Sequence, residues 1–181
     1  MEQKLTLLPL VGMEWQGQTL PFGASSQEAD GVLGTPDQAG EKRRYYFDSE
    51  LRLDFDGAGK LNFIEFLGGA GGALQPELYG VPLFRTDGEA LLELLAGHGT
   101  PTHLDGGYTV TVPEISLGLY REITPADVEA MVEEMARIDV TNLSHVDLEA
   151  ERRRSRRWDT VGIGTKDYYS VRGKKWNSLN F

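Results

Sequence analysis

Apolar and polar residues alternate with a period of two along two stretches of the chain, a pattern typical of strands with one buried face. The first stretch has its apolar residues at Tyr45, Phe47, Leu51, Leu53 and Phe55. The second has them at Tyr108, Val110, Val112, Ile115, Leu117 and Leu119. Residues 56–59, Asp-Gly-Ala-Gly, have the composition of a hairpin turn and lead into an apolar run at 61–63. We therefore predict antiparallel strands, with a further strand at about 13–16 and a last one that starts at 160–163 and ends near Tyr168 and Tyr169.

Short helices are predicted after two capping boxes, Ser25-x-x-Glu28 and Thr86-x-x-Glu89. Each helix is expected to end at a Gly-Thr-Pro sequence, at 34–36 and 99–101, because proline cannot continue a helix. A third helix is expected to begin at Thr124, before a stripe of apolar residues with helical spacing: Val128, Met131, Val132, Met135 and Ile138. Ser144-x-x-Asp147 predicts the start of a fourth helix.

The two halves of the chain share this order of signals, which indicates an internal repeat. At an offset of 61 positions, residues 20–22 (Leu-Pro-Phe) match 81–83 (Val-Pro-Leu), and the two capping boxes coincide. We predict an α+β fold of two repeats, each a helix packed on an antiparallel sheet, at 1–70 and 71–181. The second repeat would carry a helical insertion at about 124–157 and a C-terminal strand and tail. The glycines at 68–72 are expected to form a flexible join within one compact unit.

The chain has the same pattern twice: a short helix that ends at a Gly-x-Pro sequence, followed by an antiparallel meander. This pattern resembles the tandem-repeat fold of the β-lactamase inhibitor proteins. The pattern is also similar to that of the outer-membrane assembly lipoproteins of the SmpA/OmlA type. The likeness covers roughly residues 10–67 and 78–121. It implies a protein that acts through protein–protein contact and not through catalysis. No binding residue is carried over, because the chain lacks the lipobox cysteine and the disulfide of those families.

The charge of the chain is unevenly distributed. The net charge is −10 over 181 residues, but residues 1–150 hold 25 acidic against 9 basic side chains, and 151–181 hold 9 basic against 3 acidic. An acidic body repels phosphate backbones, so we expect no nucleic-acid partner. No apolar stretch approaches the roughly 20 residues of a membrane span, and no secretory signal is recognised. The lack of cysteine is compatible with a reducing compartment, and we expect a cytoplasmic protein without a membrane partner. We hypothesise that it is of bacterial type.

Residues 54–65 resemble the calcium loop of an EF-hand. The candidate ligands are Asp54 and Asp56 at the first and third positions, Asn62, and Glu65 at the bidentate twelfth position. Ala58, however, occupies the fifth position, where an oxygen ligand is needed, and the residues before the loop alternate as a strand does. A plain β-hairpin is therefore the favoured interpretation, and a calcium-binding protein is the alternative.

The sequence indicates no catalytic residue and no cofactor. The glycines after residue 68 lack the third glycine and the capped helix of a nucleotide fingerprint. No Gly-x-Ser-x-Gly sequence occurs, and nothing in the sequence pairs a histidine with an evident catalytic nucleophile. We therefore expect that the protein is not an enzyme. The second alternative is an enzyme whose active-site cleft lies between the two repeats.

For the arginines of 152–157, we favour internal ion pairs with the preceding helix over a role in ligand binding. The expected partners are Glu129, Glu133 and Glu134, together with a helical pair from Glu149 to Arg153. The candidate protein-binding residues are Tyr45, Tyr46, Arg152, Arg153 and Arg156. We predict a non-catalytic protein-binding module, of the immunity or inhibitor-like kind, whose partner is a protein.

Overall fold

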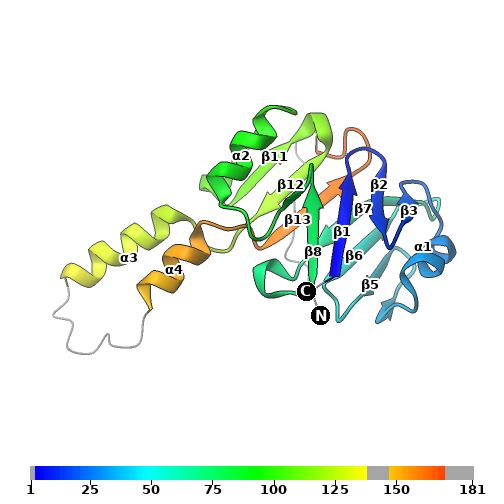
Figure 1. The fold of residues 1–181 in the computed structure, drawn as a ribbon, viewed down its shortest axis with the longest axis horizontal. Helices are drawn as coiled ribbons and strands as arrows, with labels where there is room; N and C mark the ends of the chain where they lie inside the picture. Colours follow the sequence, from blue (N-terminus) through cyan, green and yellow to red (C-terminus); the bar gives the residue numbers. More distant parts are fainter. Residues whose placement is uncertain (1–2, 138–146, 170–181) are drawn as a thin grey trace.

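The structure is a computed structural model of the 181-residue chain, and it describes residues 3–137 and 147–169. In this part of the chain, four α-helices and two β-sheets form a mixed α+β fold, and the strands pair largely in antiparallel fashion. The smaller sheet lies over the middle of the larger one, with helix α2 (Gly88–Ala96) at one end and α1 (Ser26–Leu33) at the other (Figure 1). The α+β class predicted from the sequence is confirmed.

The larger sheet has eight strands in the order β10-β11-β12-β13-β7-β6-β5-β4, and all neighbours are antiparallel. At its centre, β13 (Thr160–Gly164) pairs with β7 (Leu61–Phe66), so strands from both halves of the chain share one sheet. The other strands are β4 (Gln38–Ala39), β5 (Arg43–Tyr46), β6 (Leu51–Phe55), β10 (Thr102–Leu104), β11 (Thr109–Val112) and β12 (Leu117–Tyr120).

The smaller sheet has the order β3-β2-β1-β8-β9, and its central pair, β1 with β8, is parallel. Its strands are β1 (Gln3–Leu8), β2 (Gly12–Trp15), β3 (Gln18–Pro21), β8 (Leu74–Leu78) and β9 (Val81–Pro82). The sequence pattern predicts β2 but not β1 or β8. The alternation in β1 covers only Leu5, Thr6 and Leu7, which is too short to predict a strand, and Pro76 in the middle of β8 disfavours a strand by sequence.

One hydrophobic core lies between the two sheets and the helices α1 and α2. Alternate residues of the strands point into it, among them Leu53 of β6, Leu119 of β12 and Leu7 of β1, none more than 2% exposed. Full burial of a side chain of this size contributes about 1.5–3 kcal/mol to folding. The alternation in the sequence therefore marks the correct buried face of β6, β11 and β12.

The predicted cap of α1 is confirmed. The Ser25 hydroxyl accepts from the Glu28 N–H at 3.3 Å, and the Glu28 carboxylate accepts from the Ser25 N–H at 2.7 Å. The predicted cap of α2 is wrong by one residue. Asp87 caps this helix, while the Thr86 hydroxyl donates to the carbonyl oxygen of Pro82 at 2.7 Å. A carboxylate at the cap also interacts favourably with the positive end of the helix dipole.

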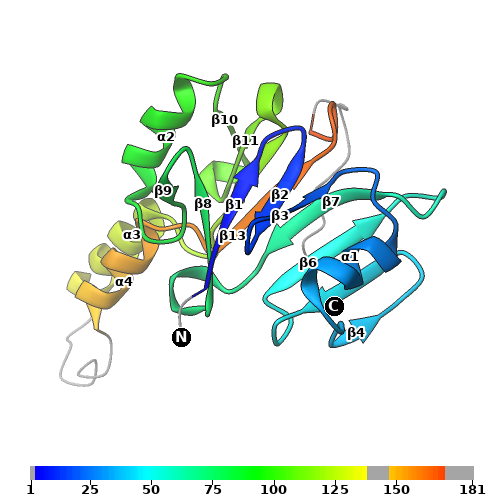
Figure 2. The same ribbon diagram turned by 45° about the vertical axis from the view of Figure 1, so that its right-hand side comes forward.

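The predicted helical insertion is present as a hairpin of α3 (Pro125–Arg137) and α4 (Leu148–Ser155) that projects from the body (Figure 2). Thr124 and Asp127 form a reciprocal cap at the start of α3, and Asp147 caps α4 by accepting from the Ala150 N–H at 3.0 Å. Ile138 and Ser144, which the prediction included, lie outside the described residues.

The flexible join predicted at 68–72 is wrong. This segment forms a short 3-10 turn, η1 (Gly69–Gly71), in which Gly69 is buried. The Gln75 side-chain amide donates to Gly72 O at 2.8 Å and to Gly69 O at 3.2 Å. The Glu50 carboxylate accepts from the backbone N–H groups of Ala73 and Leu74, at 2.9 and 2.8 Å. These side chains satisfy the backbone of a glycine-rich segment that sequence composition alone assigns to a linker.

Two other strand limits differ from the prediction. Phe47 does not continue β5, because residues 47–49 all have positive φ and form a turn. The last strand ends at Gly164, short of Tyr168 and Tyr169. Two further 3-10 turns, η2 (Asp105–Gly107) and η3 (Pro113–Ile115), flank β11.

None of the helices in the described part of the chain has both the length and the apolar character needed to cross a membrane.

Candidate functional site

Helix α4 is fixed to the body by the tryptophan that follows it. Trp158 is 1% exposed and belongs to the hydrophobic core. The guanidinium of Arg121, directly after β12, lies over the Trp158 ring at 4.7 Å from its centre. Arg121 also donates to Ser155 O and to Gly107 O, each at 3.0 Å. A buried cation over an aromatic ring, with its N–H groups bonded, holds the end of α4 in one position.

The end of α4 also contacts the start of α2. The Gly88 N–H donates to Arg156 O at 2.7 Å. A Cβ at Gly88 would lie 3.2 Å from the same oxygen and 3.4 Å from Trp158 Nε1, so glycine permits this close approach. Asp87, the cap of α2, accepts from Arg156 Nε at 2.7 Å. These contacts join two segments that are far apart in the sequence.

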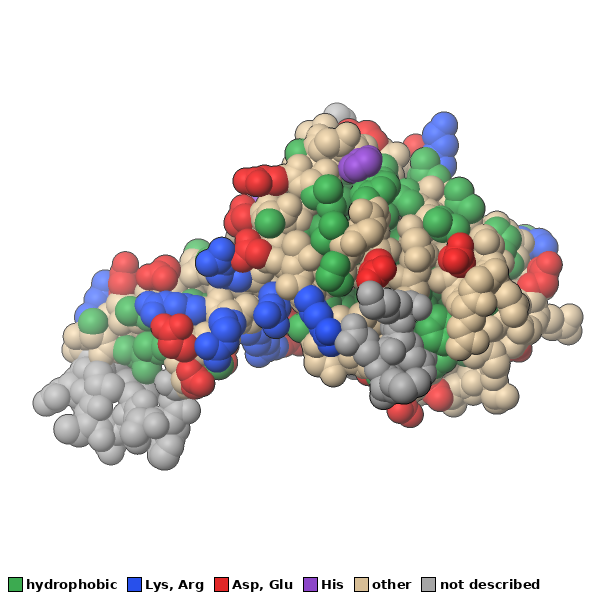
Figure 3. Space-filling model, in the orientation of Figure 1, with side chains coloured by type: hydrophobic (Ala, Val, Ile, Leu, Met, Phe, Trp, Pro, Cys, Tyr) green, Lys and Arg blue, Asp and Glu red, His purple; other side chains and the backbone are tan. Residues whose placement is uncertain are grey.

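Four exposed arginines meet at this junction, and we call them the arginine surface: Arg85, Arg153, Arg156 and Arg157. Together with Asp87 they line a hollow of about 340 Å³. A neighbouring hollow of about 220 Å³ shares Arg153 and Arg157 and has Trp158 in its wall. Figure 3 shows cationic side chains gathered where the helical hairpin meets the body.

Some cations at the junction are neutralised within the protein and others are not. Arg156 pairs with Asp87, and Arg154 pairs with Glu122. Burial acts to raise the pKa of Asp87, but hydrogen bonds from Arg156 and from backbone N–H groups outweigh it and lower the pKa below its ordinary value. Within residues 3–137 and 147–169, the side chains of Arg153 and Arg157 make no ion pair or hydrogen bond.

The predicted internal pairing is therefore correct for only part of the arginine run. Arg152 lies 4.0 Å from Glu129 across the hairpin and 3.4 Å from Glu149 on its own helix. The expected pair of Glu149 with Arg153 is wrong, because Glu149 faces Arg152 instead. Glu133 pairs with Arg137 on its own helix, at 3.8 Å.

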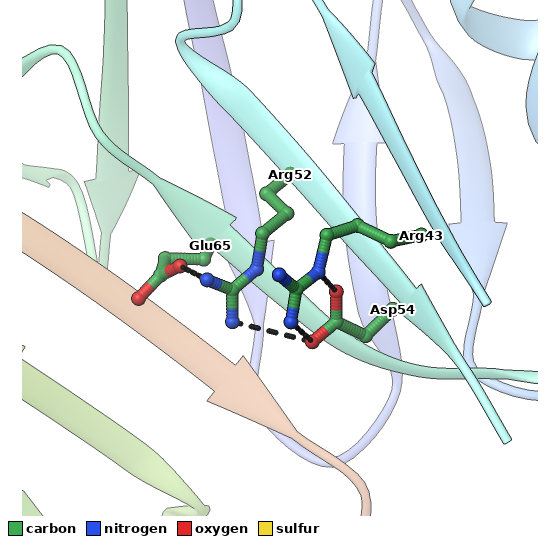
Figure 4. A network of polar contacts seen from close by, with 4 residues as sticks. All are labelled: Arg43, Arg52, Asp54 and Glu65. Carbon is green, nitrogen blue, oxygen red and sulfur yellow. Dashed lines mark hydrogen bonds and ion pairs between the residues drawn. The ribbon is translucent and has the colours of Figure 1, made fainter. Parts of the chain in front are cut away.

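A second group of charged side chains lies on the face of the larger sheet that points away from the core. Arg43 Nε lies 2.9 Å from Asp54 Oδ1, Arg52 Nη2 lies 3.2 Å from Asp54 Oδ2, and Arg52 Nη1 lies 2.6 Å from Glu65 Oε2 (Figure 4). Glu65 is fully buried, and burial raises its pKa to about 7 although Arg52 opposes the shift. Tyr168 stacks on Phe63 beside this group, with ring centres 4.5 Å apart.

The favoured hairpin is confirmed at the calcium-like sequence, and the helix–loop–helix of an EF-hand is not formed. Asp54 lies on β6 and Glu65 on β7, where both bind arginines. Asp56 closes the turn by accepting from the N–H groups of Ala58 and Lys60, at 2.8 and 3.0 Å. Asn62 lies on β7, half-buried. Among the described residues, no three His, Asp or Glu side chains are grouped as a metal ion requires.

The tyrosines proposed for protein binding differ in position. Tyr45 is half-buried on β5. The prediction that Tyr46 is an exposed contact residue is wrong, because its side chain is 1% exposed and belongs to the core. Its hydroxyl donates to Asp30 of α1 at 2.7 Å, and the neighbouring Arg44 pairs with the same carboxylate. Alternation along β5 gives one tyrosine to each face of the sheet.

Sequence reasoning did not identify Arg85, Asp87, Arg121 or Trp158 as parts of the junction. Trp158 carried a signal, since a large apolar residue directly after five arginines is expected to be an anchor. Arg85 and Asp87 carried none, because only the folded chain brings α2 and α4 together. No family model, curated protein or solved structure matches the chain, so the resemblance to tandem-repeat inhibitor proteins stays a prediction.

Proposed function

We propose that the protein is a non-catalytic, cytoplasmic protein-binding module that engages an acidic protein through the arginine surface. The observation that carries this proposal is the concentration of exposed arginines around one hollow, two of which have no carboxylate partner in the described chain. Arginine is enriched at protein interfaces because its planar guanidinium binds carboxylates through paired hydrogen bonds.

The distribution of charge supports an acidic partner. The chain carries a net charge of −10, so electrostatic repulsion disfavours contact with an acidic protein everywhere except at the cationic regions of the chain. An acidic partner approaching this surface is steered toward one orientation, because the rest of the body repels it. The same distribution disfavours a polynucleotide, whose successive phosphates would meet the acidic body beside the arginines.

The rigidity of the junction supports binding without a large ordering cost. Arg153 lies on α4, Arg156 is held by Asp87, and α4 is fixed by Trp158 and Arg121. Guanidiniums carried on a fixed helix end lose little backbone entropy when a partner binds. The projecting hairpin of α3 and α4 adds surface beside the arginines for the same partner (Figure 1).

We further propose that the two halves are repeats, and that the role is of the immunity or inhibitor-like kind. Supporting the repeat, β4–β7 and β10–β13 each form a four-stranded meander, each preceded by a short helix, and the meanders meet through β7 and β13. The immunity role rests on the resemblance of this arrangement to inhibitor proteins, which is an argument by analogy.

The test is recovery of a stoichiometric partner from the native host by the purified, tagged full-length protein. The double variant R153E/R157E is the matched probe, and R137E, which reverses an exposed arginine on α3, is the control. We expect an acidic protein to be retained by the parent and by R137E and to be lost with R153E/R157E. Equal recovery by all three variants, or no stoichiometric partner, would refute the proposal.

A further inference from the structure

The hollow of the arginine surface has more positive charge than one carboxylate neutralises. Four guanidiniums line it, of which Arg85 has a further interaction of its own, and Asp87 is its one acidic lining residue. Asp87 is already engaged by Arg156 at 2.7 Å and by the N–H groups at the start of α2. Arg153 and Arg157 line both this hollow and its neighbour, and neither has an ion-pair partner among the described residues. The hollow therefore favours a ligand with more than one negative charge.

We propose that this hollow binds a phosphate monoester carried by the protein partner, an inference that rests on the proposed function. A phosphorylated side chain carries about −1.5 to −2 charges at neutral pH and three acceptor oxygens, and it binds several guanidiniums at once. A single aspartate or glutamate offers one charge and two oxygens, so it can contact both unpaired arginines but neutralises only one of their two charges. The charge of the hollow thus favours a phosphorylated segment over an unmodified acidic one.

The form of the site also favours a single phosphate over a chain of them. The hollow of about 340 Å³ is local, and an adjoining hollow that shares Arg153 and Arg156 with it is lined by the acids Glu129 and Glu149. A polynucleotide would place further phosphates against these acids, whereas a phosphorylated side chain brings one dianion and a neutral backbone. The phosphate would enter between Arg153 and Arg157, and Arg156 would stay on Asp87.

The experiment is calorimetric titration of the full chain with four probes at constant ionic strength. They are inorganic phosphate, a blocked Gly-Gly-phosphoserine-Gly-Gly peptide, the same peptide with aspartate in place of phosphoserine, and a ten-nucleotide oligoadenylate. The variant R153Q/R157Q removes the two unpaired charges, and R137Q removes an arginine that pairs with Glu133 on α3. Circular dichroism and thermal melting confirm that each variant is folded.

We expect saturable binding of phosphate and of the phosphopeptide, weakened about tenfold or more in R153Q/R157Q, because each lost guanidinium removes charge-assisted hydrogen bonds. Binding by R137Q should equal that of the parent. Absence of saturable binding, equal affinity for the aspartate peptide, tighter binding of oligoadenylate or equal loss in R137Q would each overturn the inference. Recovery of an acidic, unphosphorylated partner that depends on Arg153 and Arg157 would overturn the phosphate site and leave the proposed function standing.

Discussion

Glu65 makes the stability of the protein fall as the pH rises through neutrality. It is fully buried on β7, and the charges that face it are Arg52, Asp54 and Arg43, with the Tyr169 hydroxyl close by. Burial raises its pKa from 4.5 to about 7, and the opposing effect of Arg52 does not cancel this. The folded state therefore binds the Glu65 proton more tightly than the unfolded state does.

The size of the effect follows from linkage between protonation and folding. A pKa that is higher in the folded state stabilises it below the unfolded pKa, and this contribution disappears as the pH rises through the folded pKa. For values of 4.5 and about 7, the contribution is about 3 kcal/mol, most of it lost between pH 5 and pH 8. Other carboxyls with lowered pKa values titrate at lower pH, outside this window: Glu28, Asp87, Glu114 and Asp127.

The assay is urea unfolding at several pH values from 5 to 8 for the parent and for Glu65→Gln, a neutral side chain of the same shape. The free energy of unfolding of the parent should fall across this range, and the curve of the variant should lack that fall. The difference between the two should thus move by about 3 kcal/mol in favour of the variant from low to high pH. A parent whose stability rises over this range, or a variant with the same slope, would show that Glu65 does not titrate in this way.

Three substitutions test other contacts by urea unfolding at one pH. Ser25→Ala should cost about 1 kcal/mol because it removes the reciprocal cap with Glu28, and a neutral result would contradict that role. Gly118→Val should cost about 1–3 kcal/mol, since a Cβ there would lie 2.5 Å from the Tyr169 hydroxyl; an unchanged stability would show that the ring does not pack on β12. Trp158→Ala should cost about 3–5 kcal/mol and loosen α4, and a loss below about 1 kcal/mol would refute its role as the anchor.

The sequence predicted the local parts of the fold because local signals determine them. The alternation of β6 and β12 gave the buried face, and Ser25 with Glu28 gave the first residue of α1. The predicted cap of α2 was wrong by one residue because Thr86 and Asp87 are both good capping residues. The Thr86 hydroxyl donates to the carbonyl oxygen of Pro82 instead, and Asp87 caps the helix. Local chemistry alone does not rank two such neighbours.

The long-range pairings lay beyond such reasoning. The parallel pairing of β1 with β8 and the contact of β7 with β13 depend on how distant segments meet, and no local pattern encodes either. The same limit applied to the candidate site. The arginine run was evident in the sequence, but its hollow needs Arg85 and Asp87 from the other side of the junction.

The salt dependence of partner binding tests the central claim most directly. If the arginine surface binds an acidic protein, the affinity of the isolated partner should fall steeply between low and physiological salt concentration, because screening weakens exposed charge pairs. The variant R153E/R157E should bind weakly at every salt concentration and show a much shallower dependence, while R137E should follow the parent. A partner whose affinity is insensitive to salt, or one that R153E/R157E binds as tightly as the parent does, would contradict the claim.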